Sequence, residues 1–363
     1  MLTLGRAFLV LVTGLLSSLA LVASAAGTTA THSRQVKHLQ VPVAALAIDG
    51  NRIAYDASAK LVTKTHATNK VLVWNVRTGK TVKVSGAKTA VSDGVGGDGV
   101  FQLAIAGPRV AWLVNEGGNL ESEDYLFTSS VTHPKERKVA SALRTGDSCG
   151  PGREACAGPW LGGLVGSGNL IAMNRWTTDG NGTATAAQLD VLGGSKLKQV
   201  AAGANTVQAT AADGGRVAVL HPDGSVAVYS ESGQVLVTLP PASAKEAALN
   251  GKNLVVVSET RQLEVYDASS GSLKKTLPTH GSGVHNLDIQ GNIAIYTTGP
   301  SVRAVNLSSG KTRAVVTLGK HSEILFARIS SAGMAYAVNG VRVFFGKGTL
   351  GFVPMARLKA AVG

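Results

Sequence analysis

Aromatic residues, proline and acidic residues are scarce in this chain of 363 residues, and two familiar catalytic signatures are missing from it. The sequence contains no His-Glu-x-x-His zinc motif and no glycine-rich phosphate loop followed by Lys and Ser or Thr. Their absence excludes the enzyme classes whose chemistry depends on those motifs. The eight histidines are dispersed along the chain. The sequence therefore predicts no catalytic residue and no resident metal site.

No apolar run is long enough to make a normal membrane span. Ala7–Val22 is uncharged, but it covers about 16 residues, fewer than the ~20 that a spanning helix needs. Arg6 precedes this run and Ala23-Ser24-Ala25 follows it, which is the pattern of a secretory signal peptide. We expect cleavage near Ala25, an extracytoplasmic mature chain without a stable membrane span, and a disordered lead-in at residues 26–35. An uncleaved membrane anchor is the alternative.

The chain has only two cysteines, Cys149 and Cys156, both within the segment SCGPGREACAGP. In an exported protein, two cysteines flanking a Gly-Pro loop are expected to form a disulfide. A redox pair or a metal site is the alternative. The spacing is wider than in thioredoxin-like motifs, and no other Cys or His clusters nearby, so the sequence favours the disulfide.

One pattern recurs along almost the whole chain. Each copy begins with an apolar strand, a Gly or Asn turn and a second strand, as in ALNGKNLVVV and IQGNIAIY. A third strand with apolar-polar alternation and a further Gly turn follows, as in VLVWNVRTGK and SVRAVNLSSGK. Such repeats, with a period in the forties, predict an all-β fold: a seven-bladed β-propeller of four-stranded antiparallel blades at residues 36–358, with a C-terminal tail at 359–363.

The two ends of the chain are predicted to meet in one blade. The last repeat offers strands up to Phe345 and then a weaker stretch, Thr349–Leu358. Val36–Val41 alternates apolar and polar residues in the manner of an outer strand. Because an open ring would expose strand edges, we expect this segment to pair with the last blade and to close the ring.

Two segments resemble the strand-and-turn signature of secreted bacterial propellers of the WD-repeat, YVTN-repeat and quinoprotein-like type. These segments are Val73–Lys80 and Val265–Gly271. Leu277–Asp288 resembles the histidine-containing start of a WD-repeat blade. The resemblance covers roughly residues 41–350 and implies the propeller fold. It implies no single function, because these propellers include enzymes as well as binding modules.

The first three repeats are longer than the other four, and their extra residues fall in connections that share one face of a propeller. Ligand-binding residues of a rigid scaffold usually lie on such loops. We therefore predict a ligand-binding rim over blades one to three. Its candidate residues are Asp93, Asp98, Glu121, Glu123, Asp124, Trp160, Trp176 and Asp179.

These loops are acidic in a protein whose formal net charge is +13. Ser92–Gly99 could offer oxygen ligands to calcium, but its spacing fits no EF-hand, so we predict no cofactor and keep calcium as the alternative. Trp160 and Trp176 are candidates for sugar or peptide contacts, with packing between blades as the alternative. The positive charge favours anionic partners. The cations are scattered without interleaved aromatics, however, so we expect no specific nucleic acid.

Together these observations favour a secreted, monomeric, non-catalytic binding or scaffold protein whose partner is a protein or a cell-envelope polymer. The alternative is a propeller-fold enzyme, a lactonase or a calcium-dependent hydrolase, with its site in the central channel. Such an enzyme should bring three or more Asp, Glu, His or Asn side chains onto the channel axis. A structural envelope protein held by charge is the third possibility.

Overall fold

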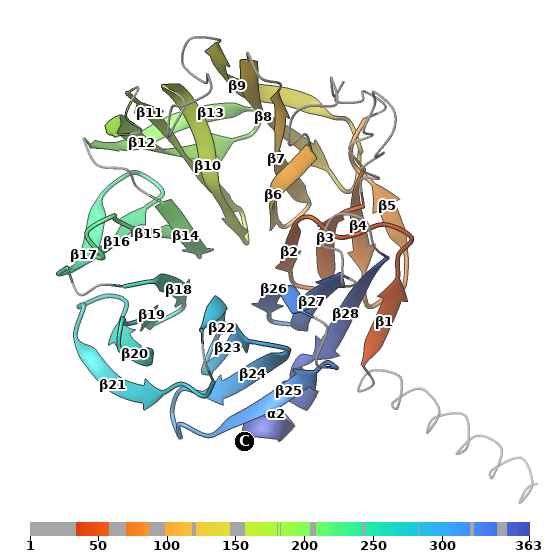
Figure 1. Cartoon of the computed structure of the whole chain (residues 1–363), viewed down its shortest axis with the longest axis vertical. Coiled ribbons are helices and arrows are strands. Elements are labelled where there is room, and N and C mark those ends of the chain that lie inside the picture. Colours follow the sequence, from red (N-terminus) through yellow and green to blue (C-terminus); the bar gives the residue numbers. More distant parts are fainter. Residues whose placement is uncertain are drawn as a thin grey trace, which may run out of the picture.

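The computed structural model contains seven four-stranded antiparallel sheets arranged in a ring, which confirms the predicted seven-bladed propeller (Figure 1). In six blades the strands follow chain order from the centre of the ring to its edge, and the seventh combines both ends of the chain. The residues that the structure describes are 34–57, 70–86, 99–117, 121–145, 157–179, 181, 183–203, 208–241, 244–281, 283–319, 323–339 and 347–363.

The first three blades differ in strand length. Blade one consists of β2 (Leu46–Asp49), β3 (Arg52–Asp56), β4 (Val71–Asn75) and β5 (Thr81–Lys83). Blade two consists of β6 (Gly99–Ala106), β7 (Arg109–Gly117), β8 (Glu121–Ser130) and β9 (Arg137–Thr145). Blade three consists of β10 (Gly158–Ser167), β11 (Leu170–Thr178), β12 (Ala184–Gly193) and β13 (Lys196–Gly203).

The next three blades are compact. Blade four consists of β14 (Gln208–Asp213), β15 (Arg216–Leu220), β16 (Val226–Ser230) and β17 (Val235–Leu239). Blade five consists of β18 (Glu246–Asn250), β19 (Asn253–Val257), β20 (Gln262–Asp267) and β21 (Leu273–Pro278). Blade six consists of β22 (His285–Gln290), β23 (Ile293–Thr298), β24 (Ser301–Asn306) and β25 (Thr312–Thr317).

The seventh blade joins the two ends of the chain. It consists of β26 (Glu323–Ser330), β27 (Gly333–Asn339), β28 (Gly348–Pro354) and β1 (Gln35–His38), which is its outermost strand. β1 pairs with β28 from Gln35 opposite Phe352 to His38 opposite Thr349. The predicted closure of the ring by the N-terminal segment is therefore confirmed.

The C-terminal residues differ from the prediction. Thr349–Pro354 belongs to the third strand of blade seven, and Met355–Val362 forms the helix α2, where we expected a weak strand and a tail. The helix buries Leu358 and Val362 against blades six and seven. The Lys311 Nζ also donates to the Gly363 carbonyl at 2.7 Å. The periodicity of this short segment was misinterpreted because its apolar residues suit a helix face as well as a strand.

Apolar packing is distributed around the ring. The second strand of a blade is buried on both faces; β19 has the sequence NLVVV, and all five residues are buried. The outermost strands are largely exposed; in β21, LKKTLP, Leu277 is buried and four residues are exposed. Among the described residues, seven clusters of buried apolar side chains each lie between two adjacent blades. Each blade is therefore held by both of its neighbours.

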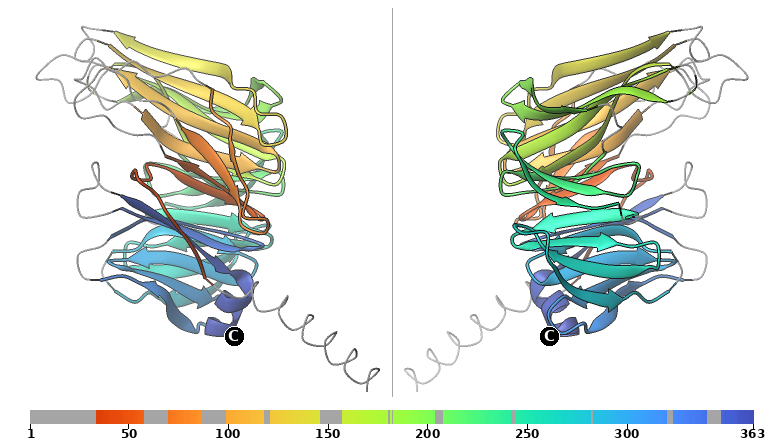
Figure 2. Two further views of the ribbon diagram at one scale, coloured as in Figure 1. Left: turned by 90° about the vertical axis from the view of Figure 1, so that its right-hand side faces the viewer. Right: turned by 90° about the vertical axis from the view of Figure 1, so that its left-hand side faces the viewer.

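The ring has a turn face and a crossover face, which Figure 2 shows edge-on. The turn face carries the tight turns between first and second strands, and hydrogen bonds join the innermost strands of neighbouring blades there. The Gly107 amide donates to the Asp49 carboxylate of the preceding blade at 2.6 Å. Gly107 has φ +56°, and a Cβ on it would lie 3.1 Å from the Gly168 carbonyl oxygen of the next blade, so glycine is required at this position.

Some predictions fall on residues that the structure does not describe. They are the signal peptide at 1–25, the lead-in up to residue 33, and the disulfide between Cys149 and Cys156. The calcium alternative at Ser92–Gly99, up to Asp98, and the expected strand that ends at Phe345 also fall there. Within the described part of the chain, no helix has both the length and the apolar character that crossing a membrane requires.

Candidate functional site

Blades two and three extend beyond their neighbours at the crossover face. β7 and β11 have nine residues each, whereas β3 and β15 in the adjacent blades have five each. All four strands begin at the turn face, so the four additional residues add about 13 Å at the crossover face. We call this extension the overhang. It comprises residues 114–117, 121–124, 142–145, 158–162, 175–179 and 184–188.

The overhang is built from paired strands where the sequence predicted loops. Of the predicted rim residues, Glu121, Glu123 and Asp124 lie on β8, Trp160 on β10 and Trp176 on β11. Strands that rise above their neighbours no longer need apolar side chains on both faces, so their sequence lacks the usual core pattern. Asp93 and Asp98 lie outside the described residues.

Asp124 is a buried structural residue, which corrects its predicted place on an exposed rim. Its carboxylate is paired with Arg144 on β9, with Oδ2 2.7 Å from Nη1 and Oδ1 3.0 Å from Nη2. Both side chains are almost fully buried. The Asn115 side-chain Nδ2 donates to Asp124 Oδ1 at 2.7 Å, and the backbone amide of Leu161 in blade three donates to Oδ2 at 3.3 Å. This carboxylate therefore connects β8 to β7 and β9 of its own blade and to β10 of blade three.

Arg144 was missed at the sequence level, and it organises the overhang. Besides Asp124 it donates to the Ser122 hydroxyl at 2.8 Å and to the Pro159 carbonyl of blade three at 2.9 Å. Its guanidinium carbon lies 3.8 Å from the ring centroid of Trp160. A bidentate, ring-stacked arginine of this kind fixes orientation as well as distance. No sequence signal identifies it, since its partners are distant along the chain.

Trp160 and Trp176 are brought together, as a pair of opposite residues on β10 and β11. Their rings are parallel, with centroids 6.3 Å apart and planes within 6°. The Trp160 indole N–H donates to Thr178 Oγ1 at 2.8 Å. The Trp176 ring occupies the space above Gly162, where a Cβ would come within 2.8 Å of it. With Arg144 on one face of Trp160, the pair acts chiefly as a support for the overhang.

A second face of the overhang lies on the side of blade one. Glu123 lies opposite both Glu116 on β7 and Leu143 on β9, and the Tyr125 hydroxyl donates to the Glu123 carboxylate at 2.6 Å. Burial, followed by the hydrogen bond to Glu123 and the charge of Glu116, raises the pKa of Tyr125. Leu143 is 47% exposed. This face combines negative charge with an accessible apolar side chain.

Asp179 shapes a turn between β11 and β12. Its Oδ1 accepts hydrogen bonds from the amides of Asn181 and Thr183, both at 2.9 Å. Such bonds stabilise an Asx-type turn. These hydrogen bonds give Asp179 a structural role in the turn, which is the alternative to its predicted role in ligand binding.

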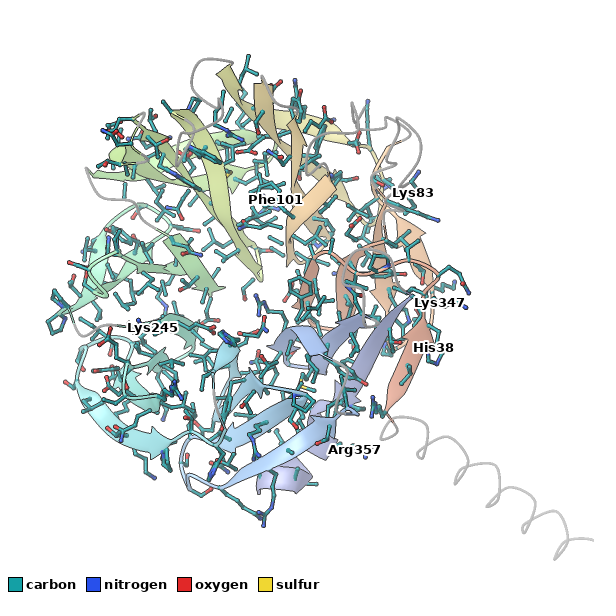
Figure 3. The ribbon with its side chains drawn as sticks, viewed as in Figure 1. His38, Lys83, Phe101, Lys245, Lys347 and Arg357 are labelled. Atoms are coloured by element: carbon teal, nitrogen blue, oxygen red, sulfur yellow. The ribbon has the colours of Figure 1, made fainter. Side chains whose placement is uncertain are left out.

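The central channel is a cavity of about 760 Å³ between the innermost strands of all seven blades. Phe101 lies beside it on the inner side of blade two (Figure 3). Its wall includes Glu246, Asn286, Asp288 and Arg328 from three successive blades. The channel thus contains the residue types that we expected of an enzyme, and their contacts decide what they do.

The channel carboxylates accept main-chain hydrogen bonds from the next blade. The amides of Asn286 and Leu287 donate to Glu246 at 3.2 and 2.6 Å, and the Ile329 amide donates to Asp288 at 2.9 Å. Burial raises the pKa of both carboxyls, while these amides and the Arg328 charge oppose the shift. Both side chains therefore connect the blades of the ring, whatever else they do.

Two further observations concern possible chemistry. In the part of the chain that the structure describes, no three His, Cys, Asp or Glu side chains are grouped as metal ligands. Gly146–Gly150, GDSCG, has the spacing of a nucleophile elbow. That motif depends on a strand-turn-helix context, whereas this segment connects β9 to β10 in an all-β ring and lies outside the described residues.

Comparisons with known proteins support the fold. No protein-family model matches the chain, and no curated protein matches it in sequence. The WD40 β-propeller domain of Doa1 is similar in structure, with 12% identity, a TM-score of 0.52, and coverage of 90% of this chain and 99% of that domain. A chain of the mitotic checkpoint complex is also similar, with 14% identity, a TM-score of 0.54, and coverage of 88% and 91%. At such low identity the likeness shows a WD40-like propeller fold.

Proposed function

We propose that the protein is an exported, non-catalytic β-propeller that binds a partner protein through the overhang of blades two and three. The observation that carries the proposal is the face formed by Glu116, Glu123, Tyr125 and Leu143. β3 and β4 of blade one end below it, and Leu143 is 47% exposed. The signal-peptide pattern at residues 1–25 supports export.

The chemistry of this face favours a partner segment that carries Lys or Arg beside an apolar residue. Glu123 lies opposite Leu143 on β9, so a carboxylate and an exposed apolar side chain stand side by side on this face. A cationic group of the partner would pair with the Glu123 carboxylate, while Leu143 would contact the apolar residue. A cell-envelope polymer bearing amino groups is the other ligand that fits.

The test compares two matched double variants. Glu123→Gln with Leu143→Thr alters the overhang, and Glu231→Gln with Leu273→Thr makes the same chemical changes at exposed positions on blades four and five. Immobilised wild type and the blade four and five variant should retain the same exported protein or wall fragment, and the overhang variant should lose it. Equal retention by all three proteins would refute the overhang as the binding surface.

The central channel supports a second candidate, a propeller-fold hydrolase such as a lactonase. The observation in its favour is the raised pKa of Glu246 and Asp288, which line a cavity of about 760 Å³. A carboxyl with a raised pKa suits general acid-base catalysis. A panel of lactones and esters, with and without added calcium, tests it. Turnover by the wild type that is lost in Glu246→Gln, in a variant that stays folded, would favour the enzyme.

A further inference from the structure

The exposed cations of this protein recur at one place in successive blades. They lie in the turn between the third and fourth strands or along the fourth strand, which is the outer edge of the ring; Figure 3 labels Lys83 at this edge. The third and fourth strands of blades one to six form six hairpins. In their described residues, one carboxylate is exposed, that of Glu231, whereas eleven cations are exposed. The cations are Arg77, Lys80, Lys83, Lys135, Arg137, Lys138, Lys196, Lys198, Lys274, Lys311 and Arg313.

The cations are concentrated on three adjacent blades. The first eight belong to blades one to three, and we call these eight residues the basic belt. The corresponding hairpin of blade four, described from Glu231 to Leu239, contains no Lys or Arg. Glu136 lies within the belt, but its carboxylate is half-buried and accepts a hydrogen bond from the Gly86 amide at 2.7 Å. The scattered cations of the sequence thus form one positively charged sector of the folded ring.

We propose that the basic belt binds a flexible linear polymer of phosphate groups. Eight exposed cations on consecutive blades can contact several phosphates of one chain at once, and each contact releases condensed counterions. The belt follows the convex outer wall of the ring (Figure 1). A flexible chain can follow a convex wall, whereas a flat bilayer touches it along one line.

Two further observations favour such a polymer over a membrane or a nucleic acid. Membrane-surface proteins combine cations with apolar residues that enter the lipid. Here Val235, Leu236 and Leu273, exposed by 50%, 40% and 55%, lie on blades four and five. Leu143 lies on β9, but six residues from Arg137, or about 20 Å along the strand. Val36 lies on β1 of blade seven. Base-stacking sites need accessible aromatic rings among the cations. The aromatic ring found beside the belt, Tyr125, is covered by Lys138, whose Nζ lies 4.9 Å from its centroid.

Protection of sheet edges does not account for this distribution of charge. Lysines on an outer strand do prevent edge-to-edge pairing. Arg77, Lys80 and Lys135, however, lie in turns rather than on the edge strands. β17 is an outer strand with the sequence VLVTL and no cation, and its first two residues are exposed. If edge protection were the cause, this apolar edge would carry the charge.

The belt and the overhang lie at opposite faces of the same blades. On β9, Arg137 of the belt and Arg144 of the overhang are seven residues apart, or about 23 Å along the strand. The two sites meet where Lys138 of the belt covers Tyr125, but neither pair of test variants changes these two residues. Failure of the proposed overhang function and failure of binding at the belt are therefore distinguishable.

The experiment measures binding of long-chain inorganic polyphosphate to the mature chain over a range of salt concentrations. The belt variant replaces Lys83, Arg137, Lys196 and Lys198 by Gln. The control variant replaces Lys252, Arg313, Arg357 and Lys359 by Gln, which removes the same formal charge from exposed positions on blades five and six and the C-terminal helix. The belt variant should lose at least about tenfold in affinity, and its salt slope should fall by about 0.7 per lost contact. The control should change less than about threefold.

Four outcomes would overturn the proposal. Equal losses in the two variants would mean that net charge alone attracts the polymer. Tighter binding of single-stranded DNA than of polyphosphate, at equal phosphate concentration, would indicate a nucleic-acid site. Tighter binding to vesicles of phosphatidylglycerol would indicate a membrane surface. Unchanged polymer binding together with new self-association of the belt variant would show that the lysines only protect strand edges.

Discussion

The overhang and the compact blades four to six hold neighbouring sheets together by different means. Between blades four and five the buried contact is apolar, with Leu254 and Val256 facing Val226 and Val228 in one cluster. The polar contacts of these blades, from Asp213 and Arg216 to Gly251, lie in the turns at the turn face. Between the extended parts of blades two and three, the contact is completed by the Arg144–Asp124 pair and its hydrogen bonds to the blade three backbone. The apolar contact depends on how well side chains fill the space between the blades. The ion-pair contact depends on where its charged and hydrogen-bonding atoms lie.

This difference explains how part of the ring can rise above the rest. Apolar packing between two blades requires side chains from both blades, so it ends where the shorter blade ends. A buried ion pair with bidentate geometry fixes two strands without requiring a third blade. Such a pair costs desolvation free energy, and it is sensitive to the loss of either partner. The overhang therefore gains a fixed shape at the expense of tolerance to substitution.

The largest expected effect comes from opening the ring, since both kinds of contact depend on closure. Deleting residues 34–43 removes β1 and the contact in which the Val43 amide donates to Asn339 Oδ1 at 2.9 Å. It also exposes the edge of β28. We expect loss of most of the stability, seen as a broad or absent thermal transition. A deletion variant that melts at the parent temperature would contradict closure through β1.

Arg144→Ala should be the most damaging single substitution in the overhang. It leaves the Asp124 carboxylate buried without its cation, which costs about 3–5 kcal/mol in comparable pairs. Chemical denaturation measures the loss. The control is Arg144→Met combined with Asp124→Leu, which removes both charges and should cost clearly less than the single change. A double variant as unstable as Arg144→Ala would mean that the pair matters for its shape rather than for its charge.

Leu254→Ala tests the compact region in the same way. Leu254 is fully buried between blades four and five, and its truncation should cost about 3 kcal/mol through lost transfer free energy and the remaining cavity. Leu254→Met, which nearly conserves volume, should cost less than about 1.5 kcal/mol. If Leu254→Met destabilised the protein as much as Leu254→Ala, the contact between blades four and five would depend on side-chain shape and not on the buried volume alone.

The sequence predicted the compact region better than the overhang, and the reason is physical. Blades four to six follow two rules that leave a periodic trace, apolar alternation and glycine turns, so their strands could be placed along the chain. In the overhang, Asp124 and Arg144 meet through a contact between residues twenty positions apart on different strands. Neither residue type carries a periodic signal there. Polar strands were thus interpreted as loops, and the residue that organises the overhang was not identified. The scattered lysines likewise form the basic belt only after the ring has closed.

The smallest expected effect is a gain of stability in mild acid from the innermost strands of blades five and six. Burial raises the pKa of Asp288 above 3.8 and that of Glu246 above 4.5, against the opposing charge of Arg328. Because the folded protein binds these protons more tightly, their contribution is fully present below the ordinary pKa values and is lost as the pH rises through the raised ones.

Lowering the pH from neutral towards the ordinary carboxyl pKa values should therefore raise the Tm of the wild type relative to the Glu246→Gln, Asp288→Asn double variant, which lacks both titrations. Asp267 works in the opposite direction, since the hydrogen bond from Lys274 lowers the pKa of its carboxyl, but its effect begins only below the ordinary pKa of an aspartate. Calorimetry of both proteins across this range measures the difference. The same pH dependence in the two proteins would show that Glu246 and Asp288 titrate normally, and that the hydrogen bonds of the compact blades hold their carboxylates as well as water does.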